Sequence, residues 1–261
     1  MNNRETLIYV AIKFNGDYDR IMEAITTHEK IEIDENVTLP KNVITILDED
    51  YPKNLYYAYK PPLVLFYKGD ISLIKRFERT VSVVGSRYFS DYGEAVTKDI
   101  VKKLPKDVIV VSGLAKGIDS IAHHSAITSK HKTIGVLPCG IDACYPPESK
   151  DLYEEMSKNH LLLSEYPGDM PPQANYFHMR NRIIAYLSKA TLVTEAHARS
   201  GTSITTAWAL SACRDVCAVP HNVYRDSFCN HLISTGAYLV ENSQDLVDIL
   251  EEKTRNSLFE A

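Results

Sequence analysis

A loop after residue 84 has the residue types that bind a phosphate group. The segment reads VSVVGSRYFSDYG and places Gly85, Ser86 and Arg87 directly after a short apolar run. Glycine lets the backbone approach a ligand, serine offers a hydroxyl and an amide, and the helix expected to follow favours an anion at its N-terminus. Arginine can hold a phosphate through two parallel hydrogen bonds. A glycine turn beside a surface arginine explains this segment alone equally well.

A second glycine-containing loop carries a lysine. In SGLAKGIDSIAHHSA, Gly113 follows Ser112, and Lys116 precedes a helix that Asp119 is expected to cap. The glycine spacing fits neither the dinucleotide fingerprint GxGxxG nor the P-loop GxxxxGK[ST]. The loop is therefore interpreted as a phosphate cradle of another kind, with Lys116 as its charge.

Two arginines follow an aromatic ring in the segment NYFHMRNRIIAYLS. Phe177 lies just before an expected apolar helix, and Arg180, Asn181 and Arg182 lie at the start of that helix. A single-stranded nucleic acid needs this combination, because the ring stacks a base and the guanidinium groups bind phosphates. The alternative is that Phe177 is a hydrophobic staple and that one arginine pairs with a carboxylate.

A third loop, in TLVTEAHARSGTSITTAWAL, also leads into a helix. The strand ends at Glu195, and Arg199, Ser200 and Gly201 precede the helix, whose N-terminus favours an anion. No histidine or second carboxylate is fixed beside Glu195 by spacing. A structural carboxylate that holds loop amides or an arginine is therefore the favoured role for Glu195.

No catalytic or metal-binding motif accompanies these loops. His123 and His124 are adjacent and so face different directions on a helix, which favours a packed or capping role over metal binding. Cys213 and Cys217 lack zinc-finger spacing, and neither G-x-S-x-G nor H-E-x-x-H occurs. The sequence predicts no catalytic residue, no metal and no cofactor.

Apolar runs alternate with helical stretches from residue 80 onward. The runs that predict strands are VSVVG (81–85), VIVVSG (108–113), TIGVL (133–137), HLLLSE (160–165), ATLVTEA (190–196), DVCAVP (215–220) and AYLV (237–240). Continuously apolar strands between helices predict an α/β fold, a doubly wound, Rossmann-like and mostly parallel sheet covered on both faces. Ligands bind such sheets outside the carboxyl ends of the strands, where these loops lie. The strand order cannot be derived from the sequence.

Three parts are predicted along the chain. Residues 1–75 form a small N-terminal region, with a helix over 18–29 and a Pro/Tyr-rich stretch that suits a covering segment or an edge strand. Residues 76–252 form the Rossmann-like core, and residues 253–261 form a tail.

The charge balance excludes one class of DNA-binding protein. The chain has 29 Lys+Arg against 34 Asp+Glu, a net charge of −5, so a polybasic nucleic-acid wrapper is excluded. Residues 81–240 carry 16 Lys+Arg against 15 Asp+Glu, which leaves room for a local phosphate site. No apolar run reaches the roughly 18 residues of a membrane span, and no secretory signal is visible. Five cysteines, an odd count, indicate reduced thiols, so we expect a cytoplasmic protein without a membrane partner.

Taken in order, these segments resemble the DNA-processing protein A family, also called Smf. The match is collinear from about residue 51 to residue 250 and is carried by the blocks PPLVLFYKGD (61–70), VGSRxxSxYG (84–93), SGLAKGIDSIAH (112–123), TIGVLPCGIDACYPPES (133–149), FHMRNRIIAYLS (177–188), EAHARSGTSITTA (195–207) and NHLISTGA (230–237). The resemblance implies a Rossmann-like core that binds single-stranded DNA, protects it and helps load the RecA recombinase during transformation and recombination. It also implies a homodimer without hydrolytic chemistry.

The resemblance implies a DNA pocket as well. The matching positions are Gly85, Ser86, Arg87, Ser112, Gly113, Lys116, Phe177, Arg180, Asn181, Ser200 and Gly201. The chain departs from the family pattern at Pro138, Tyr186, His221 and Phe228, where glycine is usual, and at His178, where proline is usual. We therefore expect a different shape for the loop after residue 220. Many members continue into a winged-helix domain, and we expect none here, because few residues follow the core.

Two other functions are compatible with this kind of fold. One is a nucleotide phosphoribohydrolase, which carries a PGGxGTxxE loop whose glutamate helps catalysis. Here the corresponding loop reads ARSGTSITT and lacks both the paired glycines and the glutamate, so a non-enzymatic protein is favoured. The other, a nucleotide-sensing regulatory module, stays open.

Overall fold

A single mixed sheet organises the computed structural model, which describes residues 2–32, 34, 37–197 and 200–252. The nine strands of these residues lie in the order β1-β2-β6-β5-β4-β3-β7-β8-β9. Their bounds are β1 (Val43–Thr45), β2 (Val64–Gly69), β3 (Thr80–Val84), β4 (Ile109–Ser112), β5 (Thr133–Val136), β6 (Leu161–Ser164), β7 (Ala190–Val193), β8 (Asp215–Ala218) and β9 (Tyr238–Leu239).

The strands from β6 across to β9 pair in parallel, as the apolar runs predicted. Every residue of β3, β4, β5, β6 and β7 is buried. Strands buried on both faces read as continuous apolar runs, which is why the sequence revealed them. The α/β, Rossmann-like fold is confirmed.

Two antiparallel strands from the N-terminal region extend this sheet. β2 pairs with β6, with Phe66 opposite Ser164 and Gly69 opposite Leu161, and β1 pairs with β2 at the sheet edge. Gly69 has a φ of +93°, and a Cβ there would lie 2.1 Å from the carbonyl oxygen of His160. Only glycine allows that close approach. The division of the chain near residue 75 stays a prediction.

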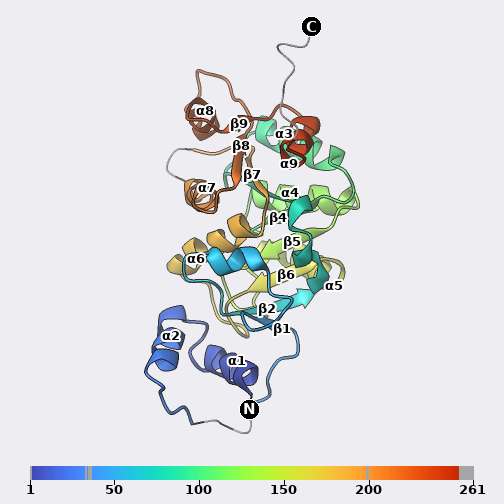
Figure 1. The fold of residues 1–261 in the computed structure, drawn as a ribbon. Coiled ribbons are helices and arrows are strands. Elements are labelled where there is room, and N and C mark those ends of the chain that lie inside the picture. Colours follow the sequence, from blue (N-terminus) through green and yellow to red (C-terminus); the bar gives the residue numbers. More distant parts are fainter. Residues whose placement is uncertain (1, 33, 35–36, 198–199, 253–261) are drawn as a thin grey trace.

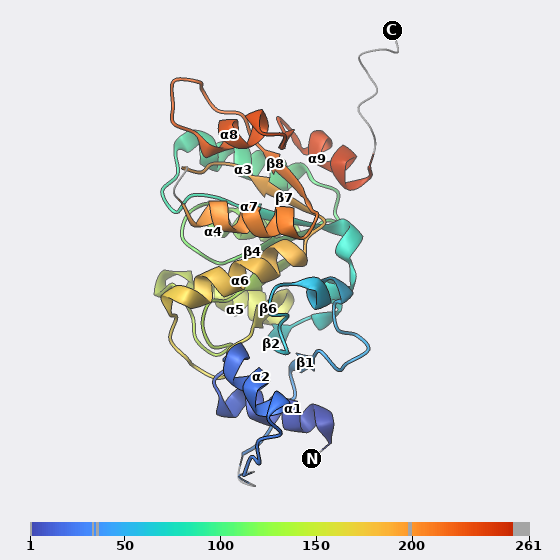
Figure 2. The same ribbon diagram turned by 60° about the vertical axis from the view of Figure 1, so that its left-hand side comes forward.

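Helices cover both faces of the sheet (Figures 1 and 2). On one face α3, α4 and α9 pack against β3 and β4, and α1 and α5 lie beside them; α6, α7 and α8 cover the other face. No helix of the described residues is long and apolar enough to cross a membrane. The bounds are α1 (Asn3–Lys13), α2 (Tyr18–Thr26), α3 (Asp91–Lys103), α4 (Ile118–Thr128), α5 (Lys150–Asn159), α6 (Ala174–Tyr186), α7 (Gly201–Ser211), α8 (Phe228–Ser234) and α9 (Ser243–Leu250).

Two helix starts differ from those expected. α6 begins at Ala174, so Phe177 lies within its first turns and not before the helix. At α4 the N-cap is Gly117, whose φ of +87° suits glycine, and Asp119 is already helical. The predicted capping role of Asp119 is therefore wrong.

The chain reverses direction across the sheet between β3 and β7. It runs from β3 through β4 and β5 to β6, then returns to place β7 on the other side of β3. The helices that follow these two neighbours, α3 and α7, lie on opposite faces. These helices thus diverge from the carboxyl ends of β3 and β7, which is the usual ligand position in a doubly wound sheet.

Candidate functional site

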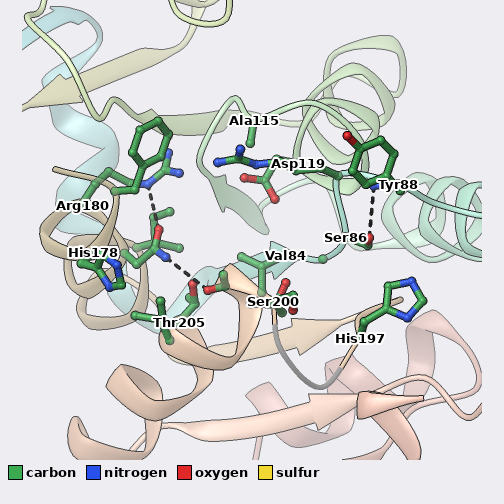
Figure 3. A pocket seen from close by; sticks show the side chains of 18 of the residues that line it. Val84, Ser86, Tyr88, Ala115, Asp119, His178, Arg180, His197, Ser200 and Thr205 are labelled. Atoms are coloured by element: carbon green, nitrogen blue, oxygen red, sulfur yellow. Dashed lines mark hydrogen bonds between the residues drawn. The ribbon is translucent and has the colours of Figure 1, made fainter. Parts of the chain in front are cut away.

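A cavity of about 740 Å³ lies at the carboxyl ends of β3 and β7 (Figure 3). The loop after β3, the start of α7 and one side of α6 line it, and Ala115 and Asp119 reach it from the loop before α4 and from α4 itself. Of the predicted site residues, the cavity brings together Gly85, Ser86, Arg87, Phe177, Arg180, Asn181, Ser200 and Gly201.

The exposed Arg87 and the half-buried Phe177 lie side by side in the cavity wall. The guanidinium carbon of Arg87 lies 5.3 Å from the centroid of the Phe177 ring, a cation–π contact. The Tyr145 ring meets Phe177 edge-on, at a centroid separation of 5.8 Å and an interplanar angle of 73°. A cation and an aromatic face are therefore available side by side at the mouth of the cavity.

Arg180 supplies a buried positive charge to the same cavity. Its Nη1 donates to the carbonyl oxygens of Gly113 and, at 2.7 Å, Val136, and its Nε donates to Asn181 Oδ1 at 2.9 Å. Burial lowers the pKa of Arg180 to about 10, while nearby Asp119 opposes that shift. The side chain is thus still protonated at neutral pH.

Asp119 holds the loop before α4 in place. Its carboxylate accepts hydrogen bonds from the backbone amides of Gly113 and Ala115, and burial raises its pKa. The opposing charge of Arg180 lowers that pKa again. Asp119 therefore orients the loop and the arginine together.

The start of α7 closes the cavity on the side of β7. Asn181 Nδ2 donates to the carbonyl oxygen of Gly201 at 3.4 Å, which ties α6 to this helix end. Ser200 is the N-cap, and its buried hydroxyl has no hydrogen-bond partner among the described residues. The first amides of a helix have no intrahelical acceptor, so this end can donate hydrogen bonds to an anion.

Gly85 lines the cavity, and close packing requires a glycine there. A Cβ there would lie 2.6 Å from Ile118 Cγ1 and 2.7 Å from the carbonyl oxygen of Glu195. That carbonyl accepts from the Ser86 amide at 2.7 Å, and Glu195 Oε2 accepts from the Ser90 amide and hydroxyl at 3.0 Å each. The structural role predicted for Glu195 is confirmed, because it joins the loops after β3 and β7.

Arg182 is not available to a ligand, so its predicted role in nucleic-acid binding is wrong. Its side chain is fully buried, and it makes two hydrogen bonds of 2.6 Å to the carboxylate of Glu165. It also donates to the carbonyl oxygens of Tyr59, Lys60 and Met179. Residues two apart on a helix face different directions, and this one faces the N-terminal region. Here the alternative of an arginine paired with a carboxylate is confirmed.

Three other predicted residues, all of them described by the structure, do not line the cavity. Lys116 is exposed and pairs with Glu148 at 2.7 Å. The Ser112 hydroxyl donates to the carbonyl oxygen of Val83 at 2.7 Å, and Gly113 makes room for Arg180, because a Cβ would lie 2.2 Å from Nη1. Ser112 and Gly113 therefore position neighbouring residues and do not themselves line the cavity. Arg199 lies outside the described residues.

His123 is a packed core residue, as predicted. Its Nδ1 lies 2.7 Å from Thr133 Oγ1, and burial lowers its pKa to about 3, so the ring is neutral at physiological pH. The described residues contain no group of three side chains that could hold a metal ion.

Comparison with known proteins identifies the family. A sequence profile described as DNA recombination-mediator protein A matches residues 42–251. The chain belongs to this family. DNA processing protein DprA of Streptococcus pneumoniae is 43% identical over 206 residues, covering 78% of this chain and 72% of the relative. The Bacillus subtilis protein of the same name is 39% identical over 216 residues, covering 81% of this chain and 72% of the relative.

Two solved structures of the family share the fold. The Streptococcus pneumoniae protein superimposes with a TM-score of 0.76 at 38% identity, covering 88% of this chain and 79% of that one. DNA processing protein A from Helicobacter pylori, described for its single-stranded DNA binding mode, gives a TM-score of 0.73 at 28% identity, covering 80% and 96%. The resemblance on which the sequence interpretation rested is therefore confirmed.

Several residues lining the cavity of this family member were not predicted as site residues. Tyr88 is 87% exposed beside Arg87, Tyr145 follows β5, and His197 follows β7. A signal was present, since all three lie in loops at the carboxyl ends of strands. His178 and Thr205 also line the cavity, one turn along α6 and α7 from the predicted residues.

Proposed function

We propose that this protein is a non-enzymatic mediator of recombination that binds single-stranded DNA, protects it and helps load RecA during DNA uptake, acting as a homodimer in the cytoplasm. One observation carries the proposal: Arg87, Arg180 and the Phe177 ring line one cavity, at the point where the strand order of the sheet reverses between β3 and β7. Membership of the recombination-mediator family supports it, as does the DNA-binding mode described for the Helicobacter pylori relative.

The cavity favours a single strand over a duplex. Phosphates would bind Arg87 and the N-terminus of α7, with the buried charge of Arg180 behind them. A base would stack on the Phe177 ring, a contact that contributes about 1–3 kcal/mol in single-strand binding proteins. A base paired within a duplex cannot present its face to that ring.

The carboxylates beside the cavity support a non-enzymatic role. Asp119 accepts from loop amides, and Glu195 accepts from Ser90. A general base must be within reach of the proton that it removes from a substrate. Both carboxylates are instead used to position loops.

The experiment is a binding titration of oligo-dT against a duplex of equal length, across a salt series, with RecA filament assembly as a second readout. We expect a preference for the single strand. Arg87→Ala should weaken binding, flatten the salt slope by about 0.7 for the lost phosphate contact, and reduce RecA loading in parallel.

Arg76→Ala is the matched control. Arg76 is exposed and lies before the amino end of β3, whereas the cavity lies at the carboxyl end of that strand. A preference for duplex, or an unchanged slope in Arg87→Ala, would contradict the proposal. If the protein binds DNA tightly but does not change RecA filament assembly, only the RecA-loading part of the proposal is contradicted.

A further inference from the structure

A second, smaller cavity of about 340 Å³ lies beside the first, at the carboxyl ends of β7 and β8. His197 lines both cavities, which makes them neighbours. Figure 3 shows His197 at the end of the main cavity away from Arg180 and His178. The second cavity is otherwise formed by Glu195, Ala196 and the loop after β8.

We propose that this second cavity is a nucleotide subsite, which binds the next part of a strand that leaves the main cavity past His197. The inference rests on the proposed function, because the strand must first occupy the main cavity. Binding sites for single strands combine cations with aromatic faces along the path of the backbone. Both kinds of group are present here.

His221 provides a fixed ring in this subsite. The ring Nε2 lies 2.9 Å from the carbonyl oxygen of Thr194, and the His221 backbone exchanges two hydrogen bonds of 2.9 Å with the Asn230 side chain. The Tyr92 ring packs edge-on against it at 5.0 Å and 81°, and Tyr92 Oη donates to the carbonyl oxygen of Pro220. A ring held from several sides loses little freedom when a ligand binds.

Arg225 provides the cation. It is exposed at the rim of the cavity and forms no salt bridge with another described residue. Two acids also line the cavity: Glu195, whose Oε2 already accepts from Ser90, and the exposed Asp226. Their charge disfavours an isolated phosphate ion. A nucleotide suits the cavity better than a free phosphate does, because its base can contact the ring in addition to its phosphate meeting Arg225.

Exposed aromatic side chains lie on the loop after β3, which lines the main cavity, and at the start of α3. Tyr88 and Phe89 follow Arg87 directly and are 87% and 42% exposed, and Tyr92, which is 47% exposed, packs against His221 of the second cavity. The strand would thus pass from one arginine to the other over aromatic surface.

The test is a length series of oligo-dT, from a dinucleotide upwards, on wild type, Arg225→Ala, Arg87→Ala and the control Arg76→Ala. Wild-type affinity should rise when the oligonucleotide becomes long enough to reach the second cavity. Arg225→Ala should bind the shortest oligonucleotide as wild type does, but lose about five- to tenfold in affinity for the longer ones, with a salt slope shallower by about 0.7. Arg87→Ala should bind all lengths more weakly.

The outcomes separate the two proposals. If the wild type binds no oligonucleotide, the proposed function fails and the subsite fails with it. If the wild type binds but Arg225→Ala behaves like Arg76→Ala at every length, the subsite alone is overturned. A loss in Arg225→Ala that is equal for short and long oligonucleotides also overturns it, because the effect would then be non-specific.

Discussion

Helix α6 carries two buried arginines, and their surroundings differ. Arg182 is neutralised by Glu165 and saturated with carbonyl acceptors, in a clamp between α6 and the N-terminal region. Arg180 is bonded mainly to backbone carbonyls, has its pKa lowered by burial, and lines the main cavity. The comparison teaches that a cation serves structure where a carboxylate and carbonyl oxygens hold it directly, and can serve a ligand where it lines a cavity.

The largest expected effect is on folding stability, when the buried Arg182–Glu165 ion pair is broken. Arg182→Met should lower the free energy of unfolding by about 3–5 kcal/mol, because it leaves the buried Glu165 carboxylate without its partner. Denaturant titration measures this loss. The folded fraction should bind oligo-dT with wild-type affinity, since Arg182 does not line the cavity.

Arg182→Met combined with Glu165→Leu is the control, because an apolar pair leaves no buried charge. Stability should recover in large part in that double variant. If Arg182→Met instead lost affinity for DNA while keeping its stability, the distinction between the two arginines would collapse.

An intermediate effect is expected at the cavity mouth. Phe177→Ala should weaken oligo-dT binding by about 1–3 kcal/mol through the lost stacking, with little change in the salt slope, because stacking releases no counterions. Titration at several salt concentrations separates these two quantities. A clear change of slope would show that Phe177 acts by holding Arg87 and not by stacking a base.

The smallest expected effect is the loss of folding stability in acid that is caused by the buried His123 of α4. His123 is neutral in the folded protein, with a pKa near 3, but takes up a proton at about 6.5 when unfolded. The unfolded state thus binds more protons as the pH falls, and stability drops. Between pH 6 and pH 5 this amounts to about 1 kcal/mol.

Denaturant titrations of wild type and His123→Gln at these two pH values test the effect. The variant is less stable throughout, but its stability should fall less on acidification. His131 and His160 have lowered pKa values as well, so the difference between the two proteins isolates the contribution of His123. Equal falls would contradict the assignment.

The strands and most helices could be predicted from the sequence because their signals are local. A continuous apolar run such as VIVV before Ser112 reports its own burial. The strand order could not be derived, because pairs such as β3 with β7 join segments far apart in the chain. The addition of β2 to β6 was hidden for the same reason.

The cavity was predictable in outline and not in detail. Glycines and polar residues after strands pointed to the correct edge of the sheet. Which arginine faces the cavity depends on where α6 begins and on Glu165, Tyr59 and Lys60, none of which is near Arg182 in the sequence. Gly85 does line the cavity, but Gly113 does not, and both glycines are required by neighbouring protein atoms.

The antiparallel pair formed by β1 and β2 has a consequence for handling fragments of this protein. β2 occupies the hydrogen-bonding side of β6 that would otherwise be open. A fragment beginning at residue 76 would leave the LLLS strand as a bare edge, able to recruit strands from other copies and form aggregates. In the intact chain β2 thus covers an edge along which other copies could pair, and a fragment designed to avoid this aggregation should include β2.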